Sequence, residues 1–135
     1  MEMKAVLLDT SAYSGFMKGD PDIKLAVQQV DEIYLSPIVL GELMSGFQKG
    51  KYRKKNEQEL VAFLSSPRVR TLQIDDGTAR RYAVILNSLW AAGTPIPTND
   101  IWIAATAMQY GFHLLTTDAH YTKVPQIIVD FFPIY

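Results

Sequence analysis

The chain has 135 residues, of which 48% are hydrophobic, and a net charge of −1 at pH 7. This length is typical of one domain with a complete core, so we predict a single domain over residues 1–135. The sequence has no cysteine, no apolar run of membrane-spanning length and no secretory signal. These features exclude disulfides and thiolate metal sites and favour a cytoplasmic protein without a membrane segment.

Short apolar runs alternate with longer helical patterns along the whole chain. The apolar runs predict five strands, at residues 4–8, 33–35, 69–74, 112–115 and 127–129. The helical patterns predict six helices, at about residues 10–18, 21–30, 37–48, 56–65, 76–92 and 98–110. Because strands separated by helices pair in parallel, the predicted class is α/β, with a five-stranded parallel sheet and helices on both of its faces.

Polar residues mark where the predicted helices begin, because their side chains bond to free backbone N–H groups at a helix N-terminus. The expected caps are Thr10 or Ser11, Ser36, Asn56, Asp75 or Asp76, and Thr98. Gly93 and Gly111 are expected to end the last two helices, since glycine readily adopts the left-handed conformation found there.

Three acidic residues lie where the predicted elements end or begin, and a fourth, Glu42, lies about a turn and a half into the helix after the second strand. Asp9 follows the first strand, Asp118 follows the fourth, and Asp100 lies in the first turn of the helix that leads into the fourth strand. Ligand sites in parallel sheets lie beyond the carboxyl ends of the strands, so these three carboxylates share a crevice if the first and fourth strands are neighbours. Glu42 joins them only if its helix leans over the first strand.

Each acid also has a purely structural explanation. Asp9 and Asp100 are well placed to cap helices, Asp118 to form a turn, and Glu42 to lie in solvent on its helix. Grouped carboxylates repel one another unless a cation lies between them, and Mg²⁺ and Mn²⁺ prefer carboxylate oxygens. With only two histidines in the chain, a metal site with oxygen ligands is the functional alternative.

Small polar residues lie beside the four acids in the sequence. These residues are Thr10, Ser11, Asn99 and Thr116. Their side chains have two alternative roles, which are to orient the carboxylates or to cap helices. His120 is either a proton carrier beside Asp118 or a structural histidine.

Taken in order, these motifs resemble those of the PIN-domain family, above all the VapC-type toxins of bacterial and archaeal toxin–antitoxin pairs. The similar segments are Asp9-Thr10-Ser11, Leu40-Gly41-Glu42-Leu43, Asn99-Asp100 with the apolar run that follows, and Leu115-Thr116-Thr117-Asp118. The resemblance implies a three-layer PIN-like sandwich with strand order 3-2-1-4-5, and an RNA-cleaving enzyme that uses Mg²⁺ or Mn²⁺. It further implies a homodimer and inhibition by a cognate antitoxin. Tyr121 stands where relatives often have phenylalanine.

Under this hypothesis Asp9, Asp100 and Asp118 hold the metal, and Glu42 binds it or orients the attacking water. The basic segment 49–55 offers Lys51, Arg53 and Lys54 as possible RNA contacts, or else is simply a solvated loop.

Two other functional classes compete with the nuclease hypothesis. A non-catalytic binding or receiver-type module also gathers acids at strand ends, but it normally has paired acids after the first strand and a lysine after a late one. A phosphatase with an aspartate nucleophile needs a second aspartate two residues after the first, and Ser11 occupies that position. The metal-dependent ribonuclease is therefore the favoured prediction.

Overall fold

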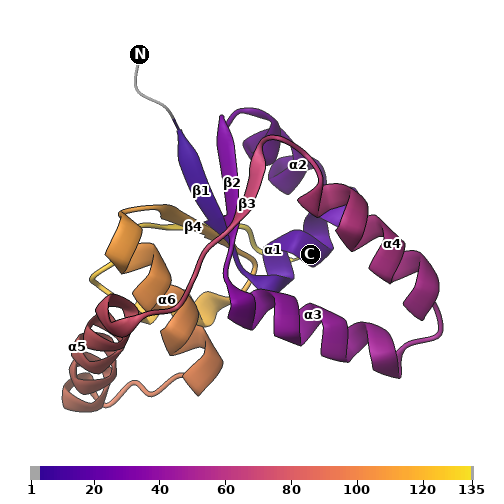
Figure 1. Cartoon of the computed structure of the whole chain (residues 1–135). Helices are drawn as coiled ribbons and strands as arrows, with labels where there is room; N and C mark the ends of the chain where they lie inside the picture. The colour runs from indigo at the N-terminus through magenta and orange to yellow at the C-terminus, as the bar shows by residue number, and fades with distance from the viewer. Residues whose placement is uncertain (1–3, 135) are drawn as a thin grey trace.

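The computed structural model describes residues 4–134, and its centre is one parallel sheet of five strands (Figure 1). The strand order is β3-β2-β1-β4-β5, which confirms the order implied by the resemblance. The strands are β1 (Ala5–Leu8), β2 (Glu32–Leu35), β3 (Val69–Thr71), β4 (His113–Thr116) and β5 (Val129–Phe131). β1 pairs with both β2 and β4, so the first and fourth strands are neighbours, as the predicted crevice requires.

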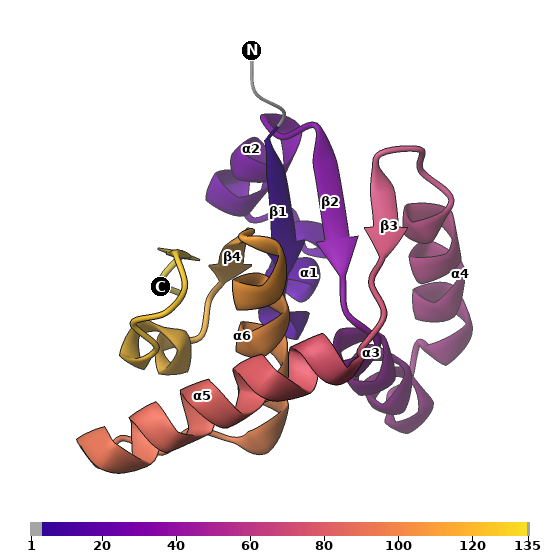
Figure 2. The same ribbon diagram turned by 60° about the vertical axis from the view of Figure 1, so that its left-hand side comes forward.

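Helices cover both faces of the sheet. They are α1 (Thr10–Met17), α2 (Pro21–Gln28), α3 (Pro37–Lys49), α4 (Arg53–Leu64), α5 (Asp76–Ala92) and α6 (Thr98–Tyr110), with a short 3₁₀ helix, η1 (Ala119–Lys123). Figure 2 shows α1 and α2 behind the sheet and α6 in front of it, with α5 packed across α6. This is the predicted three-layer arrangement. Within residues 4–134, no helix is long and apolar enough to cross a membrane.

The central strands are apolar on both sides because each side lies under helices. Leu7 and Leu8 of β1 and Leu114 and Leu115 of β4 are fully buried. Buried parallel strands lack the alternation of polar and apolar residues seen in strands with one face in solvent. Because β1 and β4 pair in parallel, their carboxyl ends lie side by side, and the residues that follow them form the site.

α6 is the most deeply buried helix, because small side chains let it approach the sheet and α5 closely. Its buried residues include Ile101, Ile103 and the run Ala104–Ala107. Gly111 ends it with φ 69°, a left-handed conformation that favours glycine. The rigid position of α6 fixes Asp100, which lies in its first turn.

Several predicted boundaries need correction. Asp9 itself caps α1, in place of Thr10 or Ser11. α4 begins at Arg53, three residues before the predicted cap Asn56, and the Arg53–Glu57 pair supports this extra turn.

Three further boundaries differ at the ends of elements. Pro97 and not Thr98 precedes α6, and it makes no side-chain cap, because proline has no side-chain oxygen to accept a hydrogen bond. β3 ends at Thr71, short of the predicted 69–74. β5 begins two residues later than predicted, since Val129 is the residue that pairs with Leu114. The caps Ser36 and Asp75 are confirmed by hydrogen bonds from Val39 N and Thr78 N.

Candidate active site

Asp9 lies at the carboxyl end of β1 with its carboxylate almost wholly buried, only 3% exposed. Its Oδ1 accepts hydrogen bonds from Ala12 N and Ser11 Oγ, both at 2.8 Å. Its Oδ2 accepts from Thr116 Oγ1 at 2.6 Å and from Ser11 Oγ at 2.9 Å. The residue therefore ends a strand, caps a helix and joins β1 to β4 through Thr116.

Burial raises the pKa of Asp9 from 3.8 to about 6. The hydrogen bonds from Thr116, Ala12 and Ser11 lower it again in part, and the neighbouring carboxylate of Asp118 raises it further. A carboxylate that is costly to ionise in the metal-free fold gains more than an exposed one from a nearby cation.

Asp100 and Asp118 meet at the same end of the sheet, with His120 between them. The Nδ1 atom of His120 is 3.2 Å from Asp100 Oδ2 and 3.2 Å from Asp118 Oδ1. The hydroxyl of Tyr121 donates to Asp100 Oδ1 at 3.2 Å. Burial raises the pKa of Asp100, while the hydrogen bonds from His120 and Tyr121 lower it in part.

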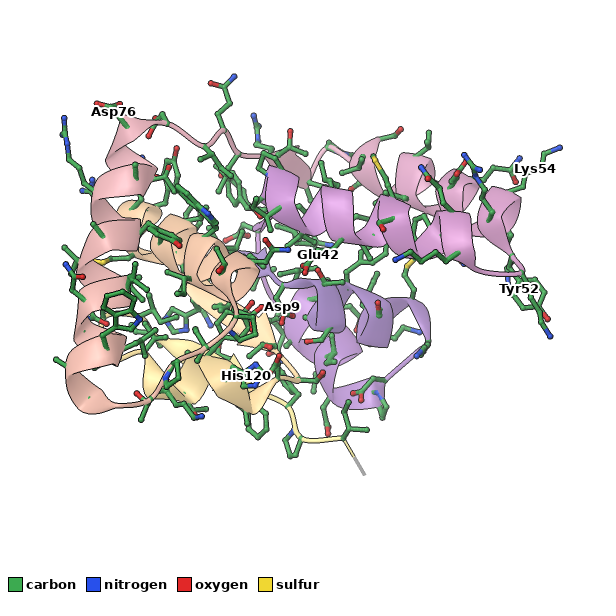
Figure 3. The ribbon with its side chains drawn as sticks, turned by 90° about the horizontal axis from the view of Figure 1, so that it is seen from below. Asp9, Glu42, Tyr52, Lys54, Asp76 and His120 are labelled. Atoms are coloured by element: carbon green, nitrogen blue, oxygen red, sulfur yellow. The ribbon has the colours of Figure 1, made fainter. Side chains whose placement is uncertain are left out.

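Glu42 reaches the site from α3, which crosses beyond the strand ends. Thr10 Oγ1 donates to its Oε1 at 2.6 Å, and Asn99 Nδ2 donates to its Oε2 at 3.3 Å. These bonds join α1, α3 and α6 above the sheet edge. Figure 3, seen from the carboxyl end of the strands, shows Asp9 between Glu42 and His120.

The donor set fits a hard divalent cation. One ligand atom from each of Asp100, Asp118 and His120 lies within 4.8 Å of the others, and all three residues are partly exposed. Carboxylate oxygens suit Mg²⁺ and Mn²⁺, and imidazole is a common ligand of transition-metal ions. His120, which the sequence-based hypothesis did not count as a ligand, joins Asp100 and Asp118 in this group. Asp9 lies near Asp118, with both of its oxygens hydrogen-bonded.

The small polar residues named from the sequence all contact an acid. Thr10 and Asn99 bond to Glu42, whereas Ser11 and Thr116 bond to Asp9. Sequence reasoning gave Tyr121 no role in the site, because the 3₁₀ helix that carries it is too short to show an apolar period. Residues three apart in a 3₁₀ helix lie on the same side, so Tyr121 falls on the side of Asp118, the cap of η1.

The basic residues Lys51, Arg53 and Lys54 do not join this cluster. They lie at the tip of the α3–α4 hairpin, where all three are exposed. Figure 3 shows Tyr52 and Lys54 at the far end of the hairpin from Asp9. A groove of about 550 Å³ runs along α3 between the two regions, and its lining includes Gly41, Glu42, Ser45, Gly46, Lys49 and Asn99.

Comparison with known proteins places this arrangement in a family. The family model described as PIN domain matches residues 6–127. Ribonuclease VapC4 of Mycobacterium tuberculosis is 31% identical over 131 residues, covering 96% of this chain and 98% of that relative.

Solved structures of relatives have the same fold. The structure of VapBC2 from Rickettsia felis, bound to a DNA fragment from its promoter, has a TM-score of 0.84 and 25% identity and covers 93% of this chain and 97% of that one. The structure of VapBC-5 from Mycobacterium tuberculosis, a member of the VapBC family of toxin–antitoxin systems, has a TM-score of 0.71 and 25% identity, covering 96% of this chain and 98% of that one. With its five-stranded sheet, its acidic strand ends and a family match along most of its length, the chain belongs to the PIN domain family.

Proposed function

We propose that this chain is a metal-dependent endoribonuclease that hydrolyses RNA phosphodiester bonds as the toxin of a toxin–antitoxin pair. The observation that carries the proposal is the meeting of Asp9, Asp100 and Asp118 at the carboxyl edge of a PIN-type sheet, beside a group able to hold a cation. Relatives named ribonucleases and structures of VapBC proteins support both the reaction and the antitoxin.

The acidic residues divide between metal binding and activation of water. Asp9, Asp100 and Asp118 hold Mg²⁺ or Mn²⁺ directly or through water, with His120 beside Asp100 and Asp118. When bound, the cation neutralises the negative charge that develops on the phosphate. Glu42, fixed by Thr10 and Asn99, orients the attacking water and accepts its proton.

We further propose a single domain over residues 1–135 that acts as a cytoplasmic homodimer. A dimer is supported by exposed apolar side chains on α5, where Trp90 is 69% exposed and Val84 is 49% exposed.

The test of this function is cleavage of a mixed RNA pool by the purified chain. We expect cleavage with Mg²⁺ or Mn²⁺, none with a chelator, and recovery when the cation is restored. A DNA pool of similar lengths tests whether RNA is preferred. Absence of cleavage with either cation, from protein freed of any antitoxin, would overturn the proposal in favour of a non-catalytic binding module.

The basic tip supports a specific prediction about RNA binding. Replacing Lys51, Arg53 and Lys54 together by glutamine should weaken binding of single-stranded RNA and flatten its salt dependence. Affinity falls with salt, so the slope of log affinity against log salt is negative. Removing one charge that pairs with a phosphate makes this slope less steep by about 0.7. Fluorescence anisotropy at several salt concentrations measures the slope, with the cleavage-deficient Asp100→Asn protein as the common background.

A matched control for this prediction lies on another helix. Arg80 of α5 is also solvent-exposed, with 76% of its side chain accessible, so Arg80→Gln removes a surface charge away from the hairpin. We expect its salt slope to equal that of the parent protein. If the triple variant also keeps the parent slope, the hairpin tip does not contact RNA.

A further inference from the structure

Tyr121 brings a buried hydroxyl to the edge of the acidic cluster. The residue lies in η1, is 1% exposed and is among the largest fully buried side chains of the protein. Most buried hydroxyls have a hydrogen-bond partner. Within residues 4–134, the partner of Tyr121 is Asp100, whose Oδ1 accepts its hydrogen at 3.2 Å.

The two oxygens of Asp100 are thereby divided between two neighbours in η1. Oδ1 is bonded to the Tyr121 hydroxyl, while Oδ2 faces Nδ1 of His120 at 3.2 Å. The last torsion of an aspartate side chain is soft, so a carboxylate without such a partner rotates readily. A donor on one oxygen therefore fixes which oxygen the carboxylate presents to a third group.

Tyr121 is suited to this task because its own side chain is rigid. A tyrosine has only two side-chain torsions, and this ring is held in the core where η1 packs against α6 and β5. A phenol hydroxyl is protonated at neutral pH, so Tyr121 can act as a hydrogen-bond donor there.

We propose that Tyr121 is a positioning residue, which holds Asp100 Oδ1 so that Oδ2 is presented to a divalent cation between Asp118 and His120. The inference rests on the metal site of the proposed function and adds the group that orients one of its ligands. Tyr121 touches neither the cation nor the substrate in this scheme. Its hydroxyl acts through Asp100 alone.

The test measures the binding of Mn²⁺ to Tyr121→Phe in the absence of RNA. Electron paramagnetic resonance detects the free ion and so gives the dissociation constant. Loss of a group that orients a metal ligand commonly weakens metal binding 10-fold to 100-fold, so we expect a dissociation constant about tenfold higher. In cleavage assays, the Mn²⁺ concentration for half-maximal rate should rise about tenfold, while the rate at saturating Mn²⁺ stays near that of the wild type.

Tyr13→Phe is the matched control, because it removes another buried phenol hydroxyl. Tyr13 is 3% exposed and packs edge-on against Phe63 of α4, with ring centroids 5.2 Å apart. Its hydroxyl has no hydrogen-bond partner in the part of the chain that the structure describes. Thermal unfolding of both metal-free variants checks that each is folded. Mn²⁺ binding by Tyr13→Phe should equal that of the wild type.

The outcomes separate this inference from the function on which it rests. Equal Mn²⁺ affinity in Tyr121→Phe and wild type would overturn the positioning role alone, as would an equal loss in Tyr13→Phe. Failure of the wild type to bind Mn²⁺ would overturn the metal site and the proposed function together. A tenfold loss of Mn²⁺ affinity in Tyr121→Phe, but not in Tyr13→Phe, supports the inference. It does so even if the mixed RNA pool of the cleavage assay contains no RNA that the protein cleaves.

Discussion

Replacement of Asp100 by asparagine should lower the rate of metal-dependent RNA cleavage by about a hundredfold or more. The change keeps the size of the side chain but removes the charge that attracts the cation beside Asp118 and His120. A loss of about 3 kcal/mol in stabilisation of the transition state corresponds to about a hundredfold in rate. Since burial raises the pKa of Asp100, the neutral amide should not destabilise the metal-free fold.

A second aspartate that also contacts a histidine provides the control. Asp130 of β5 contacts His113 Nδ1 at 3.1 Å, much as Asp100 contacts His120, but His113 lies at the start of β4 and away from the acidic site. Asp130→Asn should therefore cleave RNA at the wild-type rate. Initial rates at saturating Mn²⁺, with unfolding temperatures for all three proteins, make the comparison. Equal rates for Asp100→Asn and wild type would return Asp100 to a purely structural role.

The metal-free protein should become less stable as the pH rises from about 4 to about 6, because of Asp9. Its pKa is about 6 in the folded chain and 3.8 in the reference state, so the fold holds a proton that the unfolded chain has released. The stabilisation from that proton is complete below the unfolded pKa and is lost as the pH rises through the folded pKa. About two pKa units correspond to about 3 kcal/mol of unfolding free energy.

Urea denaturation in the presence of a chelator, at intervals between pH 4 and pH 7, measures this loss. Asp9→Asn should lack it, because the amide does not titrate and asparagine still caps a helix well. Asp100, whose pKa is also raised, remains in both proteins and cancels in the difference. Parallel stability curves for the two proteins would show that Asp9 ionises without cost. Addition of Mn²⁺ should offset the decline in the wild type.

The strands and the acids can be predicted from sequence because each has a strong local signal. β1 and β4 are short apolar runs that stop at a polar residue, and Asp9 and Asp118 follow those runs closely. The neighbouring positions of β1 and β4 follow from the resemblance alone. The sequence carries no local mark of which parallel strands pair.

The positions that sequence reasoning places wrongly or misses depend on residues distant in sequence or on weak turns. His120 and Tyr121 belong to a 3₁₀ helix too short to show any apolar period, so their approach to Asp100 follows only from the folded chain. The start of α4 has no side-chain cap, and the polar Asn56 is a misleading signal inside a helix already begun at Arg53.

The several roles of Asp9 decide how an inactive form of the chain should be made for studies with a partner. Alanine at this position would remove the cap of α1 and the link to Thr116 along with the charge. Loss of a cap alone costs about 1 kcal/mol. Inactivity of such a variant would then report damage to the scaffold as much as to the chemistry. Asp100 contributes less to the fold than Asp9 does. A substitution at Asp100 is therefore the better way to make an inactive toxin that keeps its native shape for antitoxin binding.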